Sequence, residues 1–412
     1  MLQPVSVGHK ALGDYRHLIG RALVEEIQEL AAPLAGKKVL HVSATAMGGG
    51  VSEILYAMVP LMRDAGLGAD WHIVLGREEF FNVTKTLHNA LQGDPRGLTA
   101  EDWKIFDKYN RLNAGEMDTD YDFVIIHDPQ PAALLQYANL NGNRRSRWIW
   151  RCHIDLSTPN EDSLSHLVPM VERYDAKVFH LQKYVPSGVD GKVEIVPPAI
   201  DPLSPKNMAL SPEDAAFVCD QFGVDVDRPL MCQVSRFDPW KDPLGVIDAY
   251  RIVKKEHPGV QLALVGSMAT DDPEGWDFFQ KTHEHAAGDE DIKILNNLNN
   301  VGAIEVNAFQ SQADVLLQKS TREGFGLTVS EALWKARPTI AGNVGGIPLQ
   351  ITDGETGFLV NSAEEAAAAS LKVLDDPELG KRLGRAGKEH VRTHFLMPRL
   401  LRDWLKIFNE LS

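Results

Sequence analysis

The chain has 412 residues, of which 44% are hydrophobic and 24% charged, and its formal net charge is −15. This length exceeds the ~250–300 residues at which a single core usually divides, so we expect two domains of roughly 200 residues. The negative charge disfavours nonspecific binding to nucleic acid or to an anionic membrane, because both need a basic protein surface.

Cysteine usage and hydropathy predict a cytoplasmic protein. The three cysteines include no CxxC pair, which argues against a disulfide framework and a cysteine-based zinc site. The first residues lack the pattern of a signal peptide, and no uncharged run reaches the ~18 residues that a membrane helix needs. Because no HExxH pattern occurs, we expect neither a metal site nor a cofactor.

The first half of the chain alternates apolar strand patterns with helical patterns. The predicted strands are Lys38–Val42, Ala69–Leu75, Phe123–His127, Trp148–Cys152, Val178–Leu181 and Val193–Val196. The predicted helices between them include Val51–Asp64, Pro131–Asn139 and Leu164–Arg173. This alternation is typical of a doubly wound α/β domain with a parallel sheet.

Three prolines in the segment Val196–Pro202 interrupt this alternation, because proline continues neither a helix nor a central strand. We therefore expect a linker there, between an N-terminal domain, 1–197, and a C-terminal domain, 198–396.

The second half shows the same alternation. Its predicted strands are Leu230–Val234, Gln261–Val265, Ile292–Leu295, Val315–Leu317, Thr339–Ile340 and Gly357–Val360. Its predicted helices are Leu244–Glu256, Trp276–Ala286, Glu305–Ala313, Leu327–Lys335 and Glu364–Leu374. A last helix, about Pro398–Leu411, follows the complete second sheet, so we expect residues 397–412 to cross back to the first domain. Ligands bind at the carboxyl edge of such sheets, and two such domains are expected to face a central cleft.

Two cations follow the strand Leu230–Val234. Arg236 and Lys241 flank a tight Asp-Pro turn in the sequence SRFDPWK. In a strongly acidic protein, two cations at the end of a buried strand indicate a phosphate or diphosphate site, since arginine offers a planar fork and lysine a mobile point charge. The alternative is a surface loop with two solvated cations.

A second motif, EGFGLTVSE, runs from Glu323 to Glu331 and opens a predicted helix. Glycines at a helix N-terminus let backbone N–H groups approach an anion. A glycosidase needs its two carboxyl groups within ~5–10 Å, whereas eight helical steps rise ~12 Å. We therefore expect Glu331 to bind ribose hydroxyls and Glu323 sugar hydroxyls. The alternatives are a solvated carboxylate for Glu331 and a helix N-cap for Glu323.

Further polar groups follow strands of the first half. The triple glycine before Val51 indicates a loop that approaches a ligand closely, although it lacks the GxGxxG spacing. The sequences His127-Asp128-Pro129-Gln130 and Arg151-Cys152-His153 also stand at strand ends. A single histidine there more often packs or forms a hydrogen bond than catalyses a reaction.

The two motifs of the second half, in this order, resemble the retaining glycosyltransferases of the GT-B fold. The segments GGGVSEIL, EFFNVTKTLHNALQG, HDPQPAAL, WRCHIDLS and NAFQSQADVLLQKSTREGFGLT are similar to those of trehalose-forming synthases, which transfer glucose from a nucleotide to free glucose. The resemblance covers nearly the whole chain. It implies two Rossmann-like domains, an NDP-glucose donor, glucose or trehalose as the other ligand, and a homodimer.

The resemblance also implies residue roles. Arg236 and Lys241 would stabilise the leaving diphosphate, and Glu331 would bind the ribose. The residues implied to contact the donor glucose are His153, Glu323 and the backbone of Gly324, Phe325, Gly326 and Leu327. The other implied donor or nucleotide contacts are Gly49, Gly50, Gly266, Asn296, Leu298 and Thr328. Asp128 and Gln130 would bind the acceptor. We expect attack of the acceptor hydroxyl on the same face of the sugar, because no nucleophile is evident for the opposite face.

Several alternatives stay open. The nucleotide can be UDP, ADP or GDP, and the reaction can run in either direction. A phosphorylase-like enzyme would use glucose 1-phosphate, and another glucosyltransferase would use a different small sugar acceptor. A nucleotide-sugar 2-epimerase would need no acceptor. A non-catalytic sugar-binding protein would lack the charged donor residues, yet Arg236, Lys241, Glu323 and Glu331 are all present.

Overall fold

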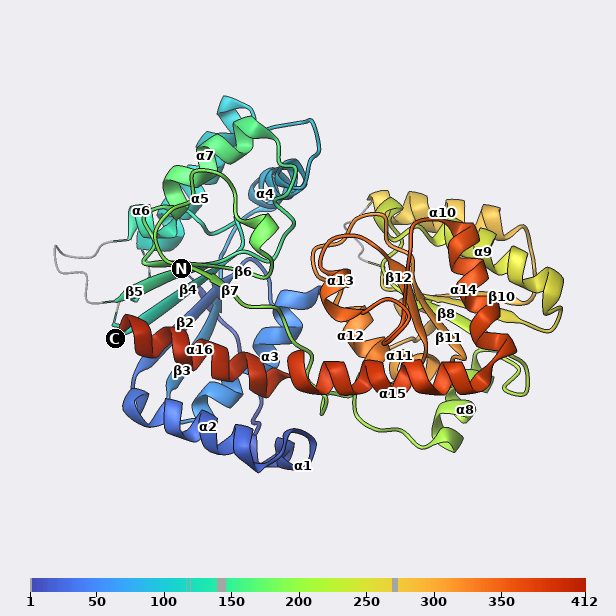
Figure 1. The fold of residues 1–412 in the computed structure, drawn as a ribbon. Coiled ribbons are helices and arrows are strands. Elements are labelled where there is room, and N and C mark those ends of the chain that lie inside the picture. Colours follow the sequence, from blue (N-terminus) through green and yellow to red (C-terminus); the bar gives the residue numbers. More distant parts are fainter. Residues whose placement is uncertain (1, 116, 119, 139–145, 269–272) are drawn as a thin grey trace. The chain divides into compact units, whose positions relative to one another are not determined.

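The computed structural model describes residues 2–412 except 116, 119, 139–145 and 269–272. The chain forms two compact units (Figure 1). Unit 1 comprises residues 1–199 together with 397–412, and unit 2 comprises residues 200–396. Each unit is built on a mainly parallel sheet, so the predicted pair of α/β domains is confirmed.

Unit 1 contains a seven-stranded sheet in the order β1-β3-β2-β4-β5-β6-β7. Only β1 runs antiparallel, against β3. The strands are β1 (Gln3–Pro4), β2 (Lys38–Ser43), β3 (Gly68–Ile73), β4 (Phe123–His127), β5 (Arg147–Arg151), β6 (Ala176–Phe179) and β7 (Val193–Ile195). All five residues of β4 are buried, as expected for a parallel strand that is covered on both faces.

The helices of unit 1 cover this sheet. They are η1 (Leu12–Tyr15), α1 (Arg16–Ile19), α2 (Arg21–Ala31), η2 (Ala32–Leu34), α3 (Gly50–Asp64), α4 (Glu78–Leu91), α5 (Ala100–Gly115), α6 (Leu134–Tyr137), α7 (Glu161–Val171), η3 (Gln182–Tyr184) and α16 (Met397–Leu411). The helix predicted over Pro131–Asn139 is wrong in extent, because the chain turns from Pro129 to Ala133 and only α6 is helical. The N–H of Gln136 donates to the carbonyl of Ala133 at 3.0 Å, and the carbonyl of Ala132, which a longer helix would use, accepts from the hydroxyl of Tyr174 at 2.8 Å. Asn139 lies outside the described residues.

Helix α16 returns to unit 1, which confirms the predicted crossing back. Its Phe408 ring stacks on Phe123 of β4 at 4.5 Å between centroids. The side-chain amide of Asn409 donates to the carbonyl of Leu30 in α2 at 2.8 Å, and Arg399 donates to the carbonyls of Pro197 and Pro198. The last helix therefore fastens both the sheet and the end of the first half of the chain.

Unit 2 contains a six-stranded, fully parallel sheet in the order β10-β9-β8-β11-β12-β13. The strands are β8 (Leu230–Val234), β9 (Gln261–Val265), β10 (Ile292–Leu295), β11 (Val315–Gln318), β12 (Thr339–Gly342) and β13 (Phe358–Val360). The helices are α8 (Pro212–Gln221), η4 (Pro239–Lys241), α9 (Pro243–Glu256), α10 (Pro273–Ala286), η5 (Asn297–Asn299), α11 (Ala303–Gln312), α12 (Leu327–Trp334), α13 (Ile347–Gln350), α14 (Ala363–Asp375) and α15 (Pro377–His394).

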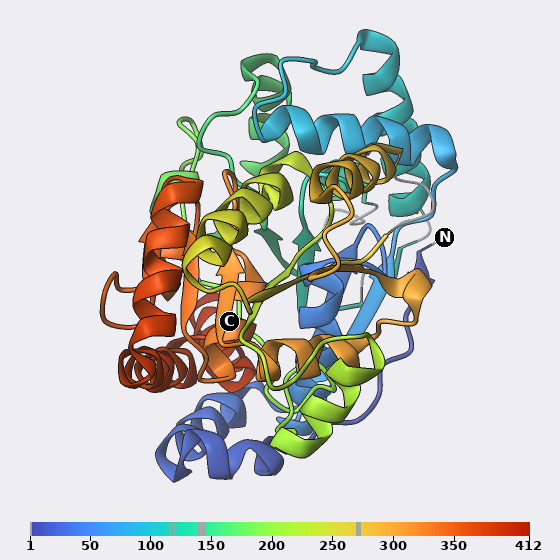
Figure 2. The same cartoon turned by 90° about the vertical axis from the view of Figure 1, so that its right-hand side faces the viewer.

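Two separate apolar cores lie on the two faces of this sheet. One contains buried residues of α9 and α14, such as Val246 and Ala366; these two helices lie side by side in Figures 1 and 2. The other contains residues of α8 and α11, such as Cys219 and Phe309. Burial on both faces explains why strands such as β8 and β9 are mostly apolar and could be predicted at their observed bounds. Among the described residues, no helix is long and apolar enough to cross a membrane.

The strand orders place a reversal in each sheet. In unit 2 the chain moves outward from β8 through β9 to β10 and then returns to β11, on the other side of β8. In unit 1, β4 likewise lies beside β2 on the side away from β3. Ligands of open α/β sheets bind at the carboxyl ends of the strands that flank such a reversal. The candidate residues of unit 2 therefore belong at the ends of β8 and β11, and those of unit 1 at the ends of β2 and β4.

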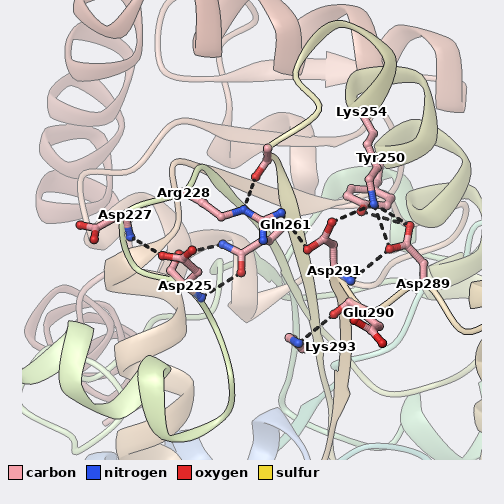
Figure 3. Close-up of polar contacts among 11 residues, drawn as sticks. Asp225, Asp227, Arg228, Tyr250, Lys254, Gln261, Asp289, Glu290, Asp291 and Lys293 are labelled. Carbon is pink, nitrogen blue, oxygen red and sulfur yellow. Dashed lines mark hydrogen bonds and ion pairs between the residues drawn. The ribbon is translucent and has the colours of Figure 1, made fainter.

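The opposite, amino edge of the unit 2 sheet carries a polar network (Figure 3). The ammonium group of Lys254 lies 2.9 Å from carboxylate oxygens of both Asp289 and Asp291. Arg228, just before β8, contacts the other oxygen of Asp291 at 2.7 Å. Burial is the largest single cause and would raise the pKa of both aspartates. The hydrogen bonds and charge of Lys254, together with the N–H of Asp291 at Asp289 and Arg228 at Asp291, outweigh burial, so the pKa of each carboxyl is lowered.

We expect Lys254→Ala to destabilise the protein by roughly 1 kcal/mol at pH 7. Because the folded-state pKa of Asp289 and Asp291 lies below the unfolded value, their stabilisation is present at neutral pH and is lost as the pH falls through the folded pKa. The difference in urea midpoint between variant and wild type should therefore shrink below about pH 4. Lys293→Ala is the control, since Lys293 at this edge donates to the carbonyl of Glu290 and forms no ion pair with another described residue. A difference that does not change with pH would contradict this account.

Candidate active site

The loop after β8 is built around Asp238. Its carboxylate accepts hydrogen bonds from the backbone N–H groups of Trp240 and Lys241 at 3.0 and 3.1 Å, which starts η4. The N–H of Thr321, after β11, donates to the carbonyl of Trp240 at 2.8 Å. The two loops that carry the sequence motifs are therefore held together by their backbones.

The side chains of the two motifs also meet. The ammonium group of Lys241 lies 2.5 Å from Oε2 of Glu323, and both side chains are largely buried. The hydroxyl of Ser320 contacts the same carboxylate oxygen at 3.3 Å. Arg236 differs, since its side chain is 64% exposed and forms an ion pair with Asp238 at 3.2 Å. One cation is thus fixed inside the site, while the other stays accessible to a ligand.

Helix α12 begins directly after these residues. Its N-cap is Gly326, at φ +81°, and no side chain caps the helix. The alternative that Glu323 is the N-cap is therefore wrong, and its carboxylate is used by Lys241 instead. The N–H of Gly346 donates to the carbonyl of Gly324 at 2.9 Å. A Cβ atom on Gly346 would lie 2.8 Å from that carbonyl oxygen, so close packing of two backbones fixes this loop.

Phe325 anchors the loop from inside. Its ring is buried and contacts the ring of Phe395 at 5.5 Å between centroids, and its carbonyl accepts from the side-chain amide of Gln350 at 2.5 Å. The following residue pair, Leu327 and Thr328, opens α12. The hydroxyl of Thr328 contacts the side-chain oxygen of Gln318 at 3.2 Å, so this hydroxyl has a partner within the protein.

Glu331 lies on the second turn of α12 and is only 1% exposed. One carboxylate oxygen lies 3.2 Å from the ammonium group of Lys206. Burial lowers the pKa of the neighbouring Lys335, and the charge of Glu331 opposes this shift. The alternative of a solvated surface carboxylate is therefore wrong for Glu331, which is a buried anion between two lysines.

The remaining predicted donor residues follow β9 and β10. A Cβ atom on Gly266 would lie 2.4 Å from the ring of Phe237 and 2.7 Å from the carbonyl oxygen of Ser235. Gly266 thus lets β9 pack against the loop that carries Arg236. The side chain of Asn296 accepts from the N–H of Leu298 at 2.8 Å, whereas the side chain of Leu298 is 60% exposed.

In unit 1, the triple glycine connects β2 to α3. Gly48 and Gly49 have φ angles of +72° and +99°, a region that other residues rarely adopt. A Cβ atom on either would meet nothing within 4 Å, so the backbone angles and not crowding explain these two glycines. Gly49 is the N-cap of α3, and Gly50 is its first residue.

Asp128, after β4, is buried and has a left-handed φ of +66°, an unusual angle that is often found at functional sites. Its carboxylate accepts from the N–H of His153 at 2.6 Å. Burial raises the pKa of this carboxyl to about 7, although that N–H group and the charge of Arg151 oppose the shift. The backbone carbonyl of Gln130 accepts from the amide of Asn110 at 3.1 Å. Within the described residues, Oε1 of Gln130 is buried with no hydrogen-bond partner.

His153 stands beside Asp128, with its ring nitrogen Nε2 2.9 Å from Nδ1 of His127. Burial is the main cause that holds the pKa of His153 well below its usual value, so the ring is neutral at pH 7. Among the described residues, no cluster of three or more His, Cys, Asp or Glu side chains has the arrangement of a metal site.

Comparisons with known proteins identify the family to which the chain belongs. The family model described as "Trehalose synthase, N-terminal domain" matches residues 41–186, and that described as "Glycosyl transferases group 1" matches residues 218–390. The chain is 60% identical over 415 residues to a trehalose synthase of Rubrobacter xylanophilus, with 100% of this chain and 99% of that protein covered. The chain belongs to the trehalose synthase family. It is also 49% identical to a trehalose synthase of Pyrococcus horikoshii, with 99% and 98% covered.

Membership of this family makes the protein a glycosyltransferase involved in trehalose formation. Among solved structures, the trehalose-6-phosphate synthase OtsA superposes with a TM-score of 0.74 at 14% identity, covering 91% of this chain and 100% of that one. This likeness shows the GT-B fold.

Sequence reasoning missed Lys206 and the partners of His153. Lys206 stands in the proline-rich segment after β7, where no periodic pattern assigns a role to a lysine. His41 lies inside β2, and a histidine in an apolar strand signals only a buried polar group. His127 was noted at a strand end, but its contacts on both sides depend on how β2, β4 and β5 are aligned.

We expect Gly266→Ala to displace the loop of Arg236, because the added methyl group would collide with Ser235 and Phe237. Overpacking of this kind costs about 1–3 kcal/mol, so both the melting temperature and kcat/KM should fall. Gly259→Ala is a matched control, since a Cβ atom there meets nothing within 4 Å. Wild-type stability and activity in Gly266→Ala would contradict the packing role.

We expect Asp128→Asn to become more stable relative to wild type as the pH rises from 6 to 8. The folded-state pKa of about 7 lies above the unfolded value of roughly 3.9. The wild type therefore loses stability as the pH rises through 7, whereas asparagine does not titrate. The difference in urea midpoint between Asp128→Asn and wild type is measured across this pH range. Because both proteins contain the same histidines, the contributions of the histidines cancel in this difference. A difference that stays constant from pH 6 to 8 would contradict the raised pKa.

Proposed function

We propose that the protein transfers glucose from a nucleoside-diphosphate glucose to free glucose, and forms α,α-trehalose with retention of the α linkage. The observation that carries this proposal is the pairing of Lys241 with Glu323 beside the exposed Arg236. This arrangement lies at the carboxyl ends of β8 and β11, next to the start of α12. It supplies two cations and a helix N-terminus for a diphosphate, together with a carboxylate for a sugar.

The chemistry assigned to unit 2 is stabilisation of the leaving group. As the bond between sugar C1 and the phosphate oxygen breaks, its electron pair stays on the diphosphate. Arg236 and Lys241 meet this growing negative charge, and charge stabilisation of this kind is among the largest catalytic effects in enzymes. Glu331 is proposed to hold the ribose, with Lys206 as its counterion inside the protein.

The acceptor half of the reaction is assigned to unit 1, where Asp128 and Gln130 would position the glucose. The acceptor hydroxyl oxygen forms the new bond to C1 on the face that the diphosphate leaves. Its proton passes to the leaving phosphate oxygen, so no protein nucleophile is needed. Because Arg236 and Lys241 supply the positive charge, we propose that the reaction needs no metal ion.

A direct test is incubation with UDP-, ADP- and GDP-glucose together with free glucose, with and without EDTA. Proton NMR of the product should show α,α-trehalose with at least one donor and in the presence of EDTA. Separate reactions offer glucose 1-phosphate without nucleotide, or the nucleotide sugar without acceptor. Product in the first of these would identify a phosphorylase, and isomerised sugar in the second an epimerase; either result without trehalose formation from NDP-glucose would overturn the proposal.

We expect Arg236→Ala and Lys241→Ala each to lower kcat by about 100- to 1000-fold, the usual effect of removing one donor to transition-state charge. Steady-state kinetics at saturating donor measures this loss. Lys254→Ala is the control, because that lysine lies at the opposite edge of the same sheet.

The variant Lys241→Ala also takes a counterion away from Glu323, so a structural loss must be separated from a catalytic one. In the double variant Lys241→Met/Glu323→Gln the buried charges are removed together, and melting should return toward the wild-type temperature. Turnover should stay low. Recovery of turnover in the double variant, or near-wild-type turnover in both single variants, would exclude the leaving-group role.

A further inference from the structure

Three histidine rings form a line through the interior of unit 1. His41 belongs to β2, His127 ends β4, and His153 follows β5. Nδ1 of His41 lies 3.0 Å from Nε2 of His127, and Nδ1 of His127 lies 2.9 Å from Nε2 of His153. Neighbouring rings are stacked, with centroids 5.3 and 5.2 Å apart. The line ends at the sulfur of Met62 in α3, 3.4 Å from Nε2 of His41.

The sulfur atom sets the direction of every hydrogen bond in this line. A neutral imidazole has one donor and one acceptor nitrogen, whereas a thioether only accepts. Nε2 of His41 must therefore carry the proton that points to Met62, and its Nδ1 accepts from Nε2–H of His127. Nδ1 of His127 in turn accepts from Nε2–H of His153. The opposite direction would place the lone pair of His41 against the sulfur lone pairs.

The line also requires the two inner rings, His41 and His127, to be neutral. An imidazolium donates from both nitrogens, so a proton added to either inner ring would place two donors face to face. Burial agrees with this requirement, because it lowers the pKa of His41 to about 3 and that of His127 well below its usual value. His153 is the only member of the line with partial exposure. Among the described residues, its Nδ1 has no hydrogen-bond partner.

We infer that Met62, His41 and His127 are positioning residues that hold His153 in its neutral Nε2–H tautomer, so that Nδ1 accepts a hydrogen bond from a ligand hydroxyl. The contacts place a proton on Nε2 of His153, and burial of the ring keeps Nδ1 unprotonated. The identification of the ligand as a donor sugar rests on the proposed function. A diphosphate has no proton to give at neutral pH and would be repelled by this lone pair. The line therefore commits His153 to a sugar hydroxyl and not to the phosphate groups.

The tautomer can be observed without any ligand. In protein labelled with ¹⁵N-histidine, the ring nitrogen shifts distinguish the two neutral tautomers from each other and from imidazolium. His41→Gln, His127→Gln and His153→Gln identify the signals by their loss. At pH 7 we expect all three rings as Nε2–H tautomers. His153 found as the Nδ1–H tautomer or as imidazolium would overturn the inference.

The positioning role is tested by Met62→Leu, which removes the sulfur acceptor with little change in volume. We expect the Nδ1–H tautomer of His41 to become populated, with altered shifts along the line to His153. Met58→Leu is the matched control, since Met58 is an equally buried methionine of the same helix. It should leave the three rings unchanged. Unchanged ring shifts in Met62→Leu would exclude Met62 as the residue that sets the direction.

The ligand hydroxyl is tested with nucleotide sugars in which single hydroxyls are replaced by fluorine, which cannot donate. Calorimetry should show roughly tenfold weaker binding of one such analogue to the wild type, as one lost hydrogen bond predicts. That difference should vanish in His153→Ala. Equal discrimination in both proteins would overturn the assigned contact. If the tautomer is confirmed but no nucleotide sugar binds or reacts, the proposed function fails while the histidine line stands.

Discussion

The contact between Lys241 and Glu323 is the interaction on which the arrangement of the unit 2 site depends. The two residues belong to motifs that are far apart in the sequence, and they meet because β8 and β11 are neighbours where the strand order reverses. The surrounding contacts hold the loops that carry these two residues. Asp238 shapes the turn that brings Lys241 forward. The close approach of Gly346 to Gly324 holds the loop that follows Glu323. A larger side chain at Gly346 would shift the carboxylate away from its partner.

The site residues of unit 1 are determined by a different constraint: polar groups buried beside its sheet need hydrogen-bond partners. Asp128 and the three histidines each lie in, or within two residues of the end of, a strand that contains several apolar residues. A buried polar atom without a partner is costly, so these groups satisfy one another. The N–H of His153 meets Asp128, and the rings meet in a line that ends at a sulfur atom. Because every other ring nitrogen in the line has a partner, only Nδ1 of His153 is left to accept a hydrogen bond from a ligand.

The sequence was sufficient for features that depend on local pattern. The strands Phe123–His127 and Leu230–Val234 were predicted at their observed bounds because strands covered on both faces are mostly apolar. The fold class and the family could be predicted from motifs that follow these strands. Helix α15 was missed: it has 18 residues and carries small or charged side chains along much of its length, so its apolar stripe is narrow. The helix predicted from Pro131 is shorter than expected, because the residues before α6 form turns although their apolar spacing is helical.

Features that depend on contacts between distant segments could not be predicted. Lys206 and Glu331 become a pair only after α12 packs near the segment that follows β7. Gly266 has a packing role that the sequence did not indicate, because a Cβ atom there would collide with the ring of Phe237 and the carbonyl of Ser235. The direction of the hydrogen bonds between the three histidines depends on the sulfur atom of Met62 in α3. In each case the determining neighbour is set by the alignment of strands, which no local pattern encodes.

The pairing of charges in unit 2 bears on how an acidic protein binds an acidic ligand. Lys241, Lys206, Lys319 and Arg236 each have an anionic partner, namely Glu323, Glu331, Asp242 and Asp238. Charges that are removed from water need such partners, so the proposed diphosphate would bind by replacing a carboxylate beside a cation. An exposed ion pair contributes little to stability, so the pair of Arg236 and Asp238 would separate more easily than the buried pair of Lys241 and Glu323. Under the proposed function, Lys241 would then act on the leaving group in a medium from which water is excluded, where a charge has most effect.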